Sequence, residues 1–242
     1  NISYLYKSYS VNIRLLQVIC MNKKQKFYIS VISNAVIFIL IITVFYFSFS
    51  DAITAAFSEP SPSAIYRGNT DKKNVSIMIN VYWGTQYIKP MLEVLKANGV
   101  KATFFIGGSW ANNNSQTLLE ICGDGHEIGN HGYFHKDHKK LSYAKNNEEI
   151  IICEKVIETV CGCKTKLFAP PSGSYNNTVL KVADDLGYKT IMWSKDTIDW
   201  RDKDDSLIYS RATKNLKNGD LVLMHPTENT LNVLDKVIKF YK

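Results

Sequence analysis

Short apolar runs alternate with longer amphipathic segments from Val75 to the end of the chain. Apolar runs of about four to eight residues are typical of buried strands, whereas apolar positions three and four residues apart indicate helices. The pattern predicts strands at 75–82, 102–106, 126–129, 166–168, 190–193 and 221–224, and helices at 87–98, 116–122, 143–160, 177–186, 206–216 and 231–241. This alternation predicts an α/β domain with a parallel sheet, either an open doubly wound sheet or a barrel.

The N-terminal part follows a different pattern, because residues 27–49 carry no charge and are almost continuously apolar. A helix needs about 20 residues to cross a bilayer, and three lysines within residues 23–26 favour a cytoplasmic N-terminus. We therefore predict a transmembrane signal-anchor at 27–49 after a cytoplasmic basic segment at 1–26. The domain beyond it would be extracytoplasmic on the cell membrane. A cleaved signal peptide and a secreted protein are the alternative, since small residues occur within 52–56.

The expected domain boundaries follow from these two patterns. Met21 and the lysines after it are typical of the start of an export signal, so an over-extended reading frame would explain residues 1–20. A Pro- and Ser-containing stretch predicts a linker at 50–73, followed by one domain at 74–242. Because the chain ends directly after a predicted helix, we expect a further closing strand and hence a truncated C-terminus.

The distribution of charge along the chain narrows the possible binding partners. Of the net charge of +7, residues 1–26 contribute five basic groups and no acidic ones, which leaves 24 basic against 22 acidic groups from Asp51 onward. A nucleic-acid partner is therefore not expected, because a nucleic-acid-binding domain carries a basic face.

Four cysteines lie in the predicted exported part: Cys122, Cys153, Cys161 and Cys163. We expect free thiols, with a disulfide involving Cys153 or a metal pair at Cys161 and Cys163 as alternatives.

Polar residues that carry chemistry follow several predicted strands, as at the rim of a barrel. His131 and His135 have a spacing that can place two imidazoles on one metal ion. His225 ends an apolar strand and could transfer protons if Asp196 or Asp199 oriented it. Each aspartate, taken alone, is better explained by helix capping or by surface solvation. The aromatic residues Trp200 and Tyr82 are either core residues or walls against which a sugar ring stacks.

Taken in order, these motifs resemble those of the polysaccharide deacetylase family, the family 4 carbohydrate esterases with a NodB-like domain. The resemblance covers about residues 75–242 and rests on five motifs: A-T-F-F-I-G at 102–107, G-H-E-I-G-N-H at 125–131, P-P-S-G-S-Y-N at 170–176, D-T-I-D-W at 196–200 and L-V-L-M-H at 221–225. It implies a distorted (β/α) barrel of seven or eight strands. It also implies removal of N-acetyl groups from amino-sugar polymers, either peptidoglycan or chitin-like, so that an N-acetylated glycan is the expected partner.

The resemblance further implies roles for individual residues. In the family, a zinc-like ion on one aspartate and two histidines polarises the acetamide carbonyl, and its water attacks. His131 and His135 would be the metal ligands, His225 the general acid and Asp199 its orienting partner. The substrate would contact Trp200, Tyr82, Pro171 and Ser172. Zinc is the expected divalent cofactor.

The chain departs from the family pattern at the positions that matter most for this chemistry. The first motif of the family has two adjacent aspartates, one a base and one a metal ligand, and here Tyr82 and Trp83 take their places. Ala169 replaces the arginine that pairs with the base, and Gly132 replaces the usual Ser or Thr. Loss of the base together with its arginine leaves neither charge buried alone. These departures indicate a compensated variant.

Three functions remain open at this stage. The first is a working deacetylase in which water, Asp137, His138 or Asp196 completes the metal ligands. The second is a catalytically impaired cell-wall glycan-binding pseudo-enzyme, and the third is hydrolysis of another amide or ester on the same scaffold.

Overall fold

The computed structural model describes residues 22–57 and 61–242. The chain divides into two compact units, one up to Pro60 and one formed by Ser61–Lys242. In the first unit, helix α2 (Lys23–Phe57) includes the predicted span at 27–49, and its part Lys23–Phe49 is long and apolar enough to cross a membrane. Length and composition alone do not distinguish an anchor from a signal sequence. The expectations for residues 1–20 and for 58–60 lie outside the described residues.

The second unit is built on a curled, fully parallel sheet of seven strands in the order β5-β4-β3-β2-β1-β7-β6. The strands are β1 (Ser76–Val81), β2 (Thr103–Ile106), β3 (Glu127–Asn130), β4 (Leu167–Phe168), β5 (Lys189–Thr190), β6 (Lys195–Asp196) and β7 (Leu221–Met224). The edge strands β5 and β6 are consecutive in the chain, so residues 191–194 run from one edge of the sheet to the other. The predicted distorted (β/α) barrel is therefore confirmed. Its edge strands β5 and β6 do not pair with each other, and residues 191–194 connect them across the gap.

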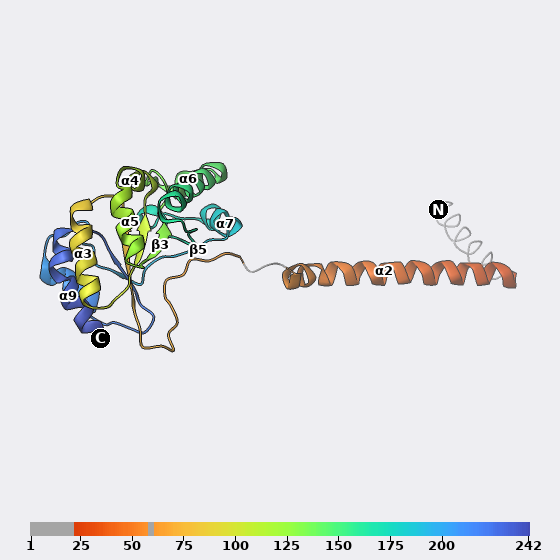
Figure 1. The fold of residues 1–242 in the computed structure, drawn as a ribbon. Helices are drawn as coiled ribbons and strands as arrows, with labels where there is room; N and C mark the ends of the chain where they lie inside the picture. Colours follow the sequence, from red (N-terminus) through yellow and green to blue (C-terminus); the bar gives the residue numbers. More distant parts are fainter. Residues whose placement is uncertain (1–21, 58–60) are drawn as a thin grey trace, which may run out of the picture. The chain divides into compact units, whose positions relative to one another are not determined.

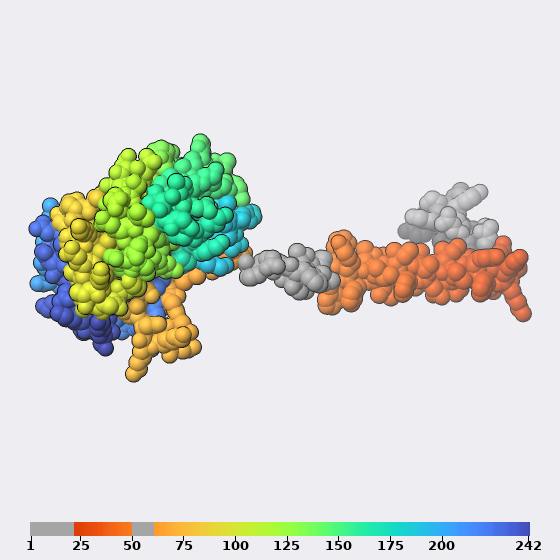
Figure 2. Space-filling view, viewed as in Figure 1, coloured from red at the N-terminus to blue at the C-terminus, as the bar shows by residue number. Residues whose placement is uncertain are grey.

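Helices cover the outside of the sheet (Figures 1 and 2). They are α3 (Thr85–Ala97), α4 (Gly108–Asn113), α5 (Ser115–Gly123), α6 (Tyr143–Cys161), α7 (Asn177–Asp185), α8 (Asp205–Thr213) and α9 (Glu228–Tyr241), with short 3₁₀ turns η1 (His138–Lys140) and η2 (Pro171–Gly173). In β1, Ile77, Ile79 and Val81 belong to the main hydrophobic core, whereas Met78 packs in a separate cluster with Phe105 and Leu223. Because side chains alternate along a strand, Asn80 shares the side of Met78, inside the barrel.

Local signals explain where the longest of these helices begins and ends. The side chain of Ser142 accepts a hydrogen bond from Lys145 N at the start of α6, which satisfies one of the free N–H groups of a helix N-terminus. The helix ends at Gly162, whose φ of 68° is left-handed and therefore favours glycine.

The structure differs from the sequence-based prediction in three places. The predicted strand at 190–193 is wrong in extent, because β5 ends at Thr190 and β6 begins at Lys195. Helix α4 was not predicted, since its sequence Gly-Ser-Trp-Ala-Asn-Asn has no helical apolar pattern. Residues 61–73 belong to the folded unit, because Ile65 pairs with Ile191 and Arg67 with Asp220, so this unit begins before the expected boundary at 74.

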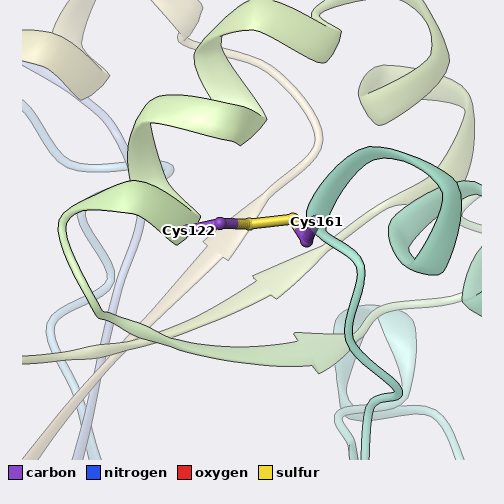
Figure 3. The surroundings of a disulfide bond; sticks show 2 residues. All are labelled: Cys122 and Cys161. Carbon is purple, nitrogen blue, oxygen red and sulfur yellow. A yellow bond between two sulfur atoms is a disulfide. The ribbon is translucent and has the colours of Figure 1, made fainter.

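The expectation of free thiols is confirmed for Cys153 and Cys163 but is wrong for Cys122 and Cys161. These two form a disulfide that joins the C-terminal ends of α5 and α6 (Figure 3), so Cys161 is not part of a metal pair with Cys163. The Cα atoms of Cys122 and Cys161 lie 6.0 Å apart, within the usual range for a disulfide. Cys153 is buried and free, which contradicts the alternative that it forms a disulfide, and burial raises its pKa to about 12. Sequence spacing could not identify this pair, because the partners are 39 residues apart and meet only through helix packing.

Replacing Cys122 and Cys161 together with serine is expected to lower the free energy of unfolding by about 2–4 kcal/mol, because the disulfide closes a long loop of the unfolded chain. Urea unfolding of the full chain in detergent, followed by tryptophan fluorescence, measures this. Cys163→Ser is the matched control, since Cys163 is free and exposed. A loss below about 0.5 kcal/mol would argue against a structural disulfide.

Candidate active site

One cavity of about 380 Å³ lies at the carboxyl ends of the strands, where parallel sheets place their ligand sites. Residues from the ends of β1, β3 and β7, from the turn η2 and from the segment around β6 form its walls. The lining residues are Asn80, Tyr82, Trp83, His131, His135, Ser172, Trp193, Asp196, Trp200, Leu223 and His225. The cavity thus brings together six of the residues singled out from sequence as site residues: Tyr82, His131, His135, Ser172, Trp200 and His225.

His131 directly follows β3 and is a buried residue of the cavity lining. Its Nδ1 lies 2.6 Å from the carbonyl oxygen of Ala169, so Nδ1 carries the proton and donates, and Nε2 keeps its lone pair. Burial, together with nearby His135, holds the pKa of His131 well below its usual range. The imidazole is therefore neutral at physiological pH and offers an acceptor at Nε2.

His135 lies on the loop after β3, with its ring 5.1 Å from that of His131. Burial also lowers the pKa of His135. Its φ of 54° places it in the left-handed region, and the loop is held by the buried carboxylate of Glu149 on α6. Glu149 Oε2 accepts hydrogen bonds from Tyr133 N and Phe134 N, at 2.9 and 2.7 Å. Glu149 therefore positions the loop that carries His135, and it is not among the lining residues of the cavity.

His225, at the end of β7, forms a pair with the buried Asp199 as the sequence analysis expected. Its Nδ1 donates to Asp199 Oδ1 at 2.8 Å, and its backbone N donates to Asp199 Oδ2 at 2.6 Å. Thr230 Oγ1 also donates to Asp199 Oδ2. The ring is thus fixed with its Nε2 free to exchange a proton, which is the arrangement of a general acid or base.

Tyr82 and Trp83 occupy the region of the missing aspartates with aromatic rings. The Tyr82 ring lies 4.8 Å from that of His135, and the Tyr82 hydroxyl accepts a hydrogen bond from Ser109 Oγ at 2.9 Å. The Trp83 ring stacks on His225 at 5.8 Å with an interplanar angle of 7°. A Cβ on Gly107 would lie 2.4 Å from Tyr82 Cδ2, so the glycine provides the space for this tyrosine.

Ala169 shows why the missing arginine leaves no gap. Its side chain is completely buried in the apolar cluster that contains Phe105 and Leu223, and its carbonyl accepts the hydrogen bond from His131. An apolar residue therefore replaces a charged one inside the barrel, and no unpaired charge remains there.

The residues present do not fit the metal ion that the resemblance implies. Within the described part of the chain, no group of three or more His, Cys, Asp or Glu residues could hold a metal ion. A structural or catalytic zinc site normally has at least three protein ligands, whereas only His131 and His135 remain here, without a carboxylate beside them.

The three proposed replacement ligands do not complete this group. Asp137 is exposed and bound to Ser174 and Lys140, and the Nδ1 of the buried His138 lies 2.7 Å from Asn146 Oδ1. Asp196 lines the cavity but forms no ligand group with the two histidines among the residues that the structure describes.

The cavity lining differs from the expected substrate contacts at Pro171, Asn80 and Trp193. Pro171 is buried in η2 and is absent from the lining residues, whereas its neighbour Ser172 is among them. Asn80 and Trp193 line the cavity but were not predicted as site residues. The signal for Asn80 was present in the sequence, since it is a polar residue inside an apolar strand, two positions before Tyr82.

Comparisons with known proteins agree with this geometry. A family model described as polysaccharide deacetylase matches residues 67–191. YlxY of Bacillus subtilis (strain 168), described as uncharacterized, is 44% identical over 177 residues, which cover 73% of this chain and 56% of YlxY. A peptidoglycan-N-acetylglucosamine deacetylase of Bacillus cereus is 29% identical over 178 residues, which cover 72% of this chain and 65% of that protein. The chain thus spans less than two thirds of the length of either relative.

Solved structures of a pseudoenzyme are also similar. The wild-type form, described as a CE4 family pseudoenzyme from Bacillus anthracis, superposes with a TM-score of 0.73 at 41% identity, over 75% of this chain and 65% of that chain. A mutant of the same protein, described as having restored enzymatic activity, superposes with a TM-score of 0.73 at 39% identity, over 75% and 67% of the two chains.

Proposed function

The chain belongs to the polysaccharide deacetylase family, and we propose that it is a cell-wall glycan-binding member that does not perform the metal-dependent hydrolysis of the family. The observation that carries this proposal is the replacement of the two carboxylates by Tyr82 and Trp83, whose rings pack on His135 and His225. Aromatic faces suit the apolar faces of sugar rings, whereas they supply neither a base nor a metal ligand. The similar pseudoenzyme supports the same conclusion.

The proposed ligand is an amino-sugar glycan of the cell wall. Two kinds of relative support this class, because they are described as peptidoglycan-N-acetylglucosamine and peptidoglycan-N-acetylmuramic acid deacetylases. The apolar helix α2 supports export, either with the helix retained as an anchor or removed as a signal peptide. In both cases the glycan-binding unit would reach the outside of the cytoplasmic membrane.

A second candidate function is hydrolysis, and the intact His225–Asp199 pair is the observation that favours it. This pair could protonate the leaving amine of an amide. The described residues of the cavity offer nothing of comparable strength to polarise the acetamide carbonyl, so the pair alone accounts for only part of the chemistry. Under this candidate, His225→Ala would abolish acetate release.

We expect the full chain in detergent micelles to bind purified insoluble peptidoglycan and to release no acetate from it, with binding changed less than about twofold by a chelator. Cosedimentation and an enzymatic acetate assay measure the two properties. Trp200→Ala should weaken binding about tenfold, since Trp200 is an exposed lining residue, whereas Phe240→Ala removes an equally exposed ring from outside the cavity. Acetate release that is lost with His225→Ala would establish the hydrolytic candidate instead.

A further inference from the structure

The most buried polar side chains that line the cavity are Asn80 and His131, and each presents an acceptor without a hydrogen bond among the described residues. Asn80 is 5% exposed, and its Oδ1 is buried without a hydrogen bond among the described residues. His131 is 1% exposed, and its Nδ1 is used by Ala169, which leaves Nε2 as an acceptor. An unsatisfied buried acceptor costs about 1–3 kcal/mol, so such groups in a cavity indicate a ligand that brings donors.

The cavity lining offers a carboxylate to a cationic ligand. Its lining contains no Lys or Arg, and Asp196 is its only carboxylate. Asp196 Oδ1 accepts a hydrogen bond from Ile198 N at 2.8 Å, which leaves Oδ2 for another donor. The cations on the same segment have other partners, because Lys195 Nζ donates to Lys214 O at 2.6 Å and Arg201 is paired with Asp202 at 2.8 Å. Asp199 is not among the lining residues and is paired with His225 Nδ1 at 2.8 Å.

Aromatic rings form most of the remaining wall. Tyr82, Trp83, Trp193 and Trp200 all line the cavity. A cation close to the face of such rings gains about 0.5–2 kcal/mol through the ring quadrupole. Buried acceptors, one carboxylate and several aromatic faces together form an environment for a small cation that carries N–H donors.

We propose that this cavity binds the ammonium group of a de-N-acetylated amino sugar, of the glucosamine type, in preference to its N-acetylated form. This inference rests on the proposed function, since it assumes that the cavity binds an amino-sugar glycan. An ammonium group has three donors and no acceptor, which matches Asn80 Oδ1, His131 Nε2 and Asp196 Oδ2. The sugar ring attached to it would lie against the exposed faces of Trp83 and Trp200.

An acetamide group fits the same environment less well. It has one donor, and its carbonyl oxygen needs a donor or a cation, which the family supplies with its metal ion. The polar atoms that Asn80 and His131 offer to this cavity are acceptors, so they would face that oxygen with like partial charge. The ammonium loses hydration when it enters, and the Asp196 carboxylate together with the hydrogen bonds compensates for this loss.

The test compares two β-1,4-linked tetrasaccharides, one of glucosamine and one of N-acetylglucosamine, by isothermal titration calorimetry with the full chain in detergent. The titration is run at about pH 6, below the pKa of about 7.7–8.0 typical of an α-amino group, so that the amines are protonated. We expect the glucosamine tetrasaccharide to bind about tenfold more tightly. Asp196→Asn should reduce this preference to less than about threefold, and Asn80→Leu should also weaken glucosamine binding.

The controls separate this inference from the proposal on which it rests. Asp71→Asn removes the same charge from an exposed position outside the cavity and should leave both affinities unchanged. Equal binding of the two sugars, or tighter binding of the N-acetylated one, would overturn the inference and leave glycan binding intact. Binding of neither sugar would overturn both. One tightly held zinc ion per wild-type chain would also overturn the inference, because the acceptors would then serve a metal.

Discussion

Replacing Tyr82 and Trp83 together with aspartate is expected to convert a chain with no tightly bound zinc into one that holds one zinc ion per molecule. The two histidines already present neutral imidazoles, since burial lowers the pKa of both. Zinc sites need at least a third ligand, and the double substitution supplies carboxylates at the two positions where the family has them. An added ligand of this kind should raise zinc affinity by about 10³-fold or more. Metal analysis after dialysis, and competition with a chromogenic chelator, measure this change.

The matched control carries the same two aspartates together with His131→Ala and should again bind no zinc. The reported pseudoenzyme mutant with restored enzymatic activity shows that a similar scaffold can regain function by substitution. The folded unit should tolerate the change, because Tyr82 and Trp83 are respectively half-buried and 43% exposed. If the wild-type chain bound zinc as tightly as the double variant, the replacement of the carboxylates would not have removed the metal site.

The fold was largely predictable because the apolar pattern of a parallel sheet is strong and local. The strand expected at 221–224 coincides with β7, and the helix expected at 143–160 differs from α6 by one residue. The error at 190–193 has a physical cause, because this segment crosses from one edge of the barrel to the other. Its residues are apolar since Ile191 packs in the inner cluster, although the segment between β5 and β6 is not a continuous strand.

The site was predictable only as far as its residues lie in recognisable motifs. His131, His135 and His225 were found because each follows a strand, and the structure places all three in one cavity. The packing that replaces the lost carboxylates was not predictable, since it joins distant parts of the chain. Tyr82 needs the space at Gly107, and Gly132 gives room to His138, whose Nε2 would lie 2.7 Å from an added Cβ. These contacts depend on tertiary distances that one sequence does not contain.

The same packing indicates whether the departures from the family pattern are random losses of catalytic groups or compensated substitutions. Ala169 is buried in an apolar cluster, and Tyr82 is held by a hydrogen bond from Ser109. Random loss of catalytic groups would leave cavities or unpaired charges, which destabilise a protein. Among the described side chains, the buried polar atoms without a hydrogen bond are Asn80 Oδ1 and His138 Nε2, and only Asn80 faces the cavity. The altered site is therefore well packed, with its one orphaned acceptor directed at the ligand position.

Asp199→Ala is expected to lower the free energy of unfolding by about 3–5 kcal/mol, the largest loss we expect from a single substitution in the site. Asp199 is buried and accepts hydrogen bonds from the backbone and ring nitrogens of His225 and from Thr230, so it joins the segment after β6 to the end of β7 and the start of α9. Its removal leaves three donors without an acceptor in a region that water enters poorly. Urea unfolding of the full chain in detergent, followed by near-UV circular dichroism, measures the loss.

Two matched substitutions show whether this loss comes from the hydrogen-bond network. Asp199→Asn keeps one acceptor oxygen but turns an NH₂ group towards the remaining donors, so its loss should be about half that of alanine. Asp196→Asn removes a carboxylate three positions away in the D-T-I-D-W motif, from a partly exposed site, and should cost less than about 1 kcal/mol. If Asp199→Ala cost no more than Asp196→Asn, the buried carboxylate would not be what holds His225 in place. The His225–Asp199 pair would then be retained for proton transfer, which would favour the hydrolytic candidate over glycan binding alone.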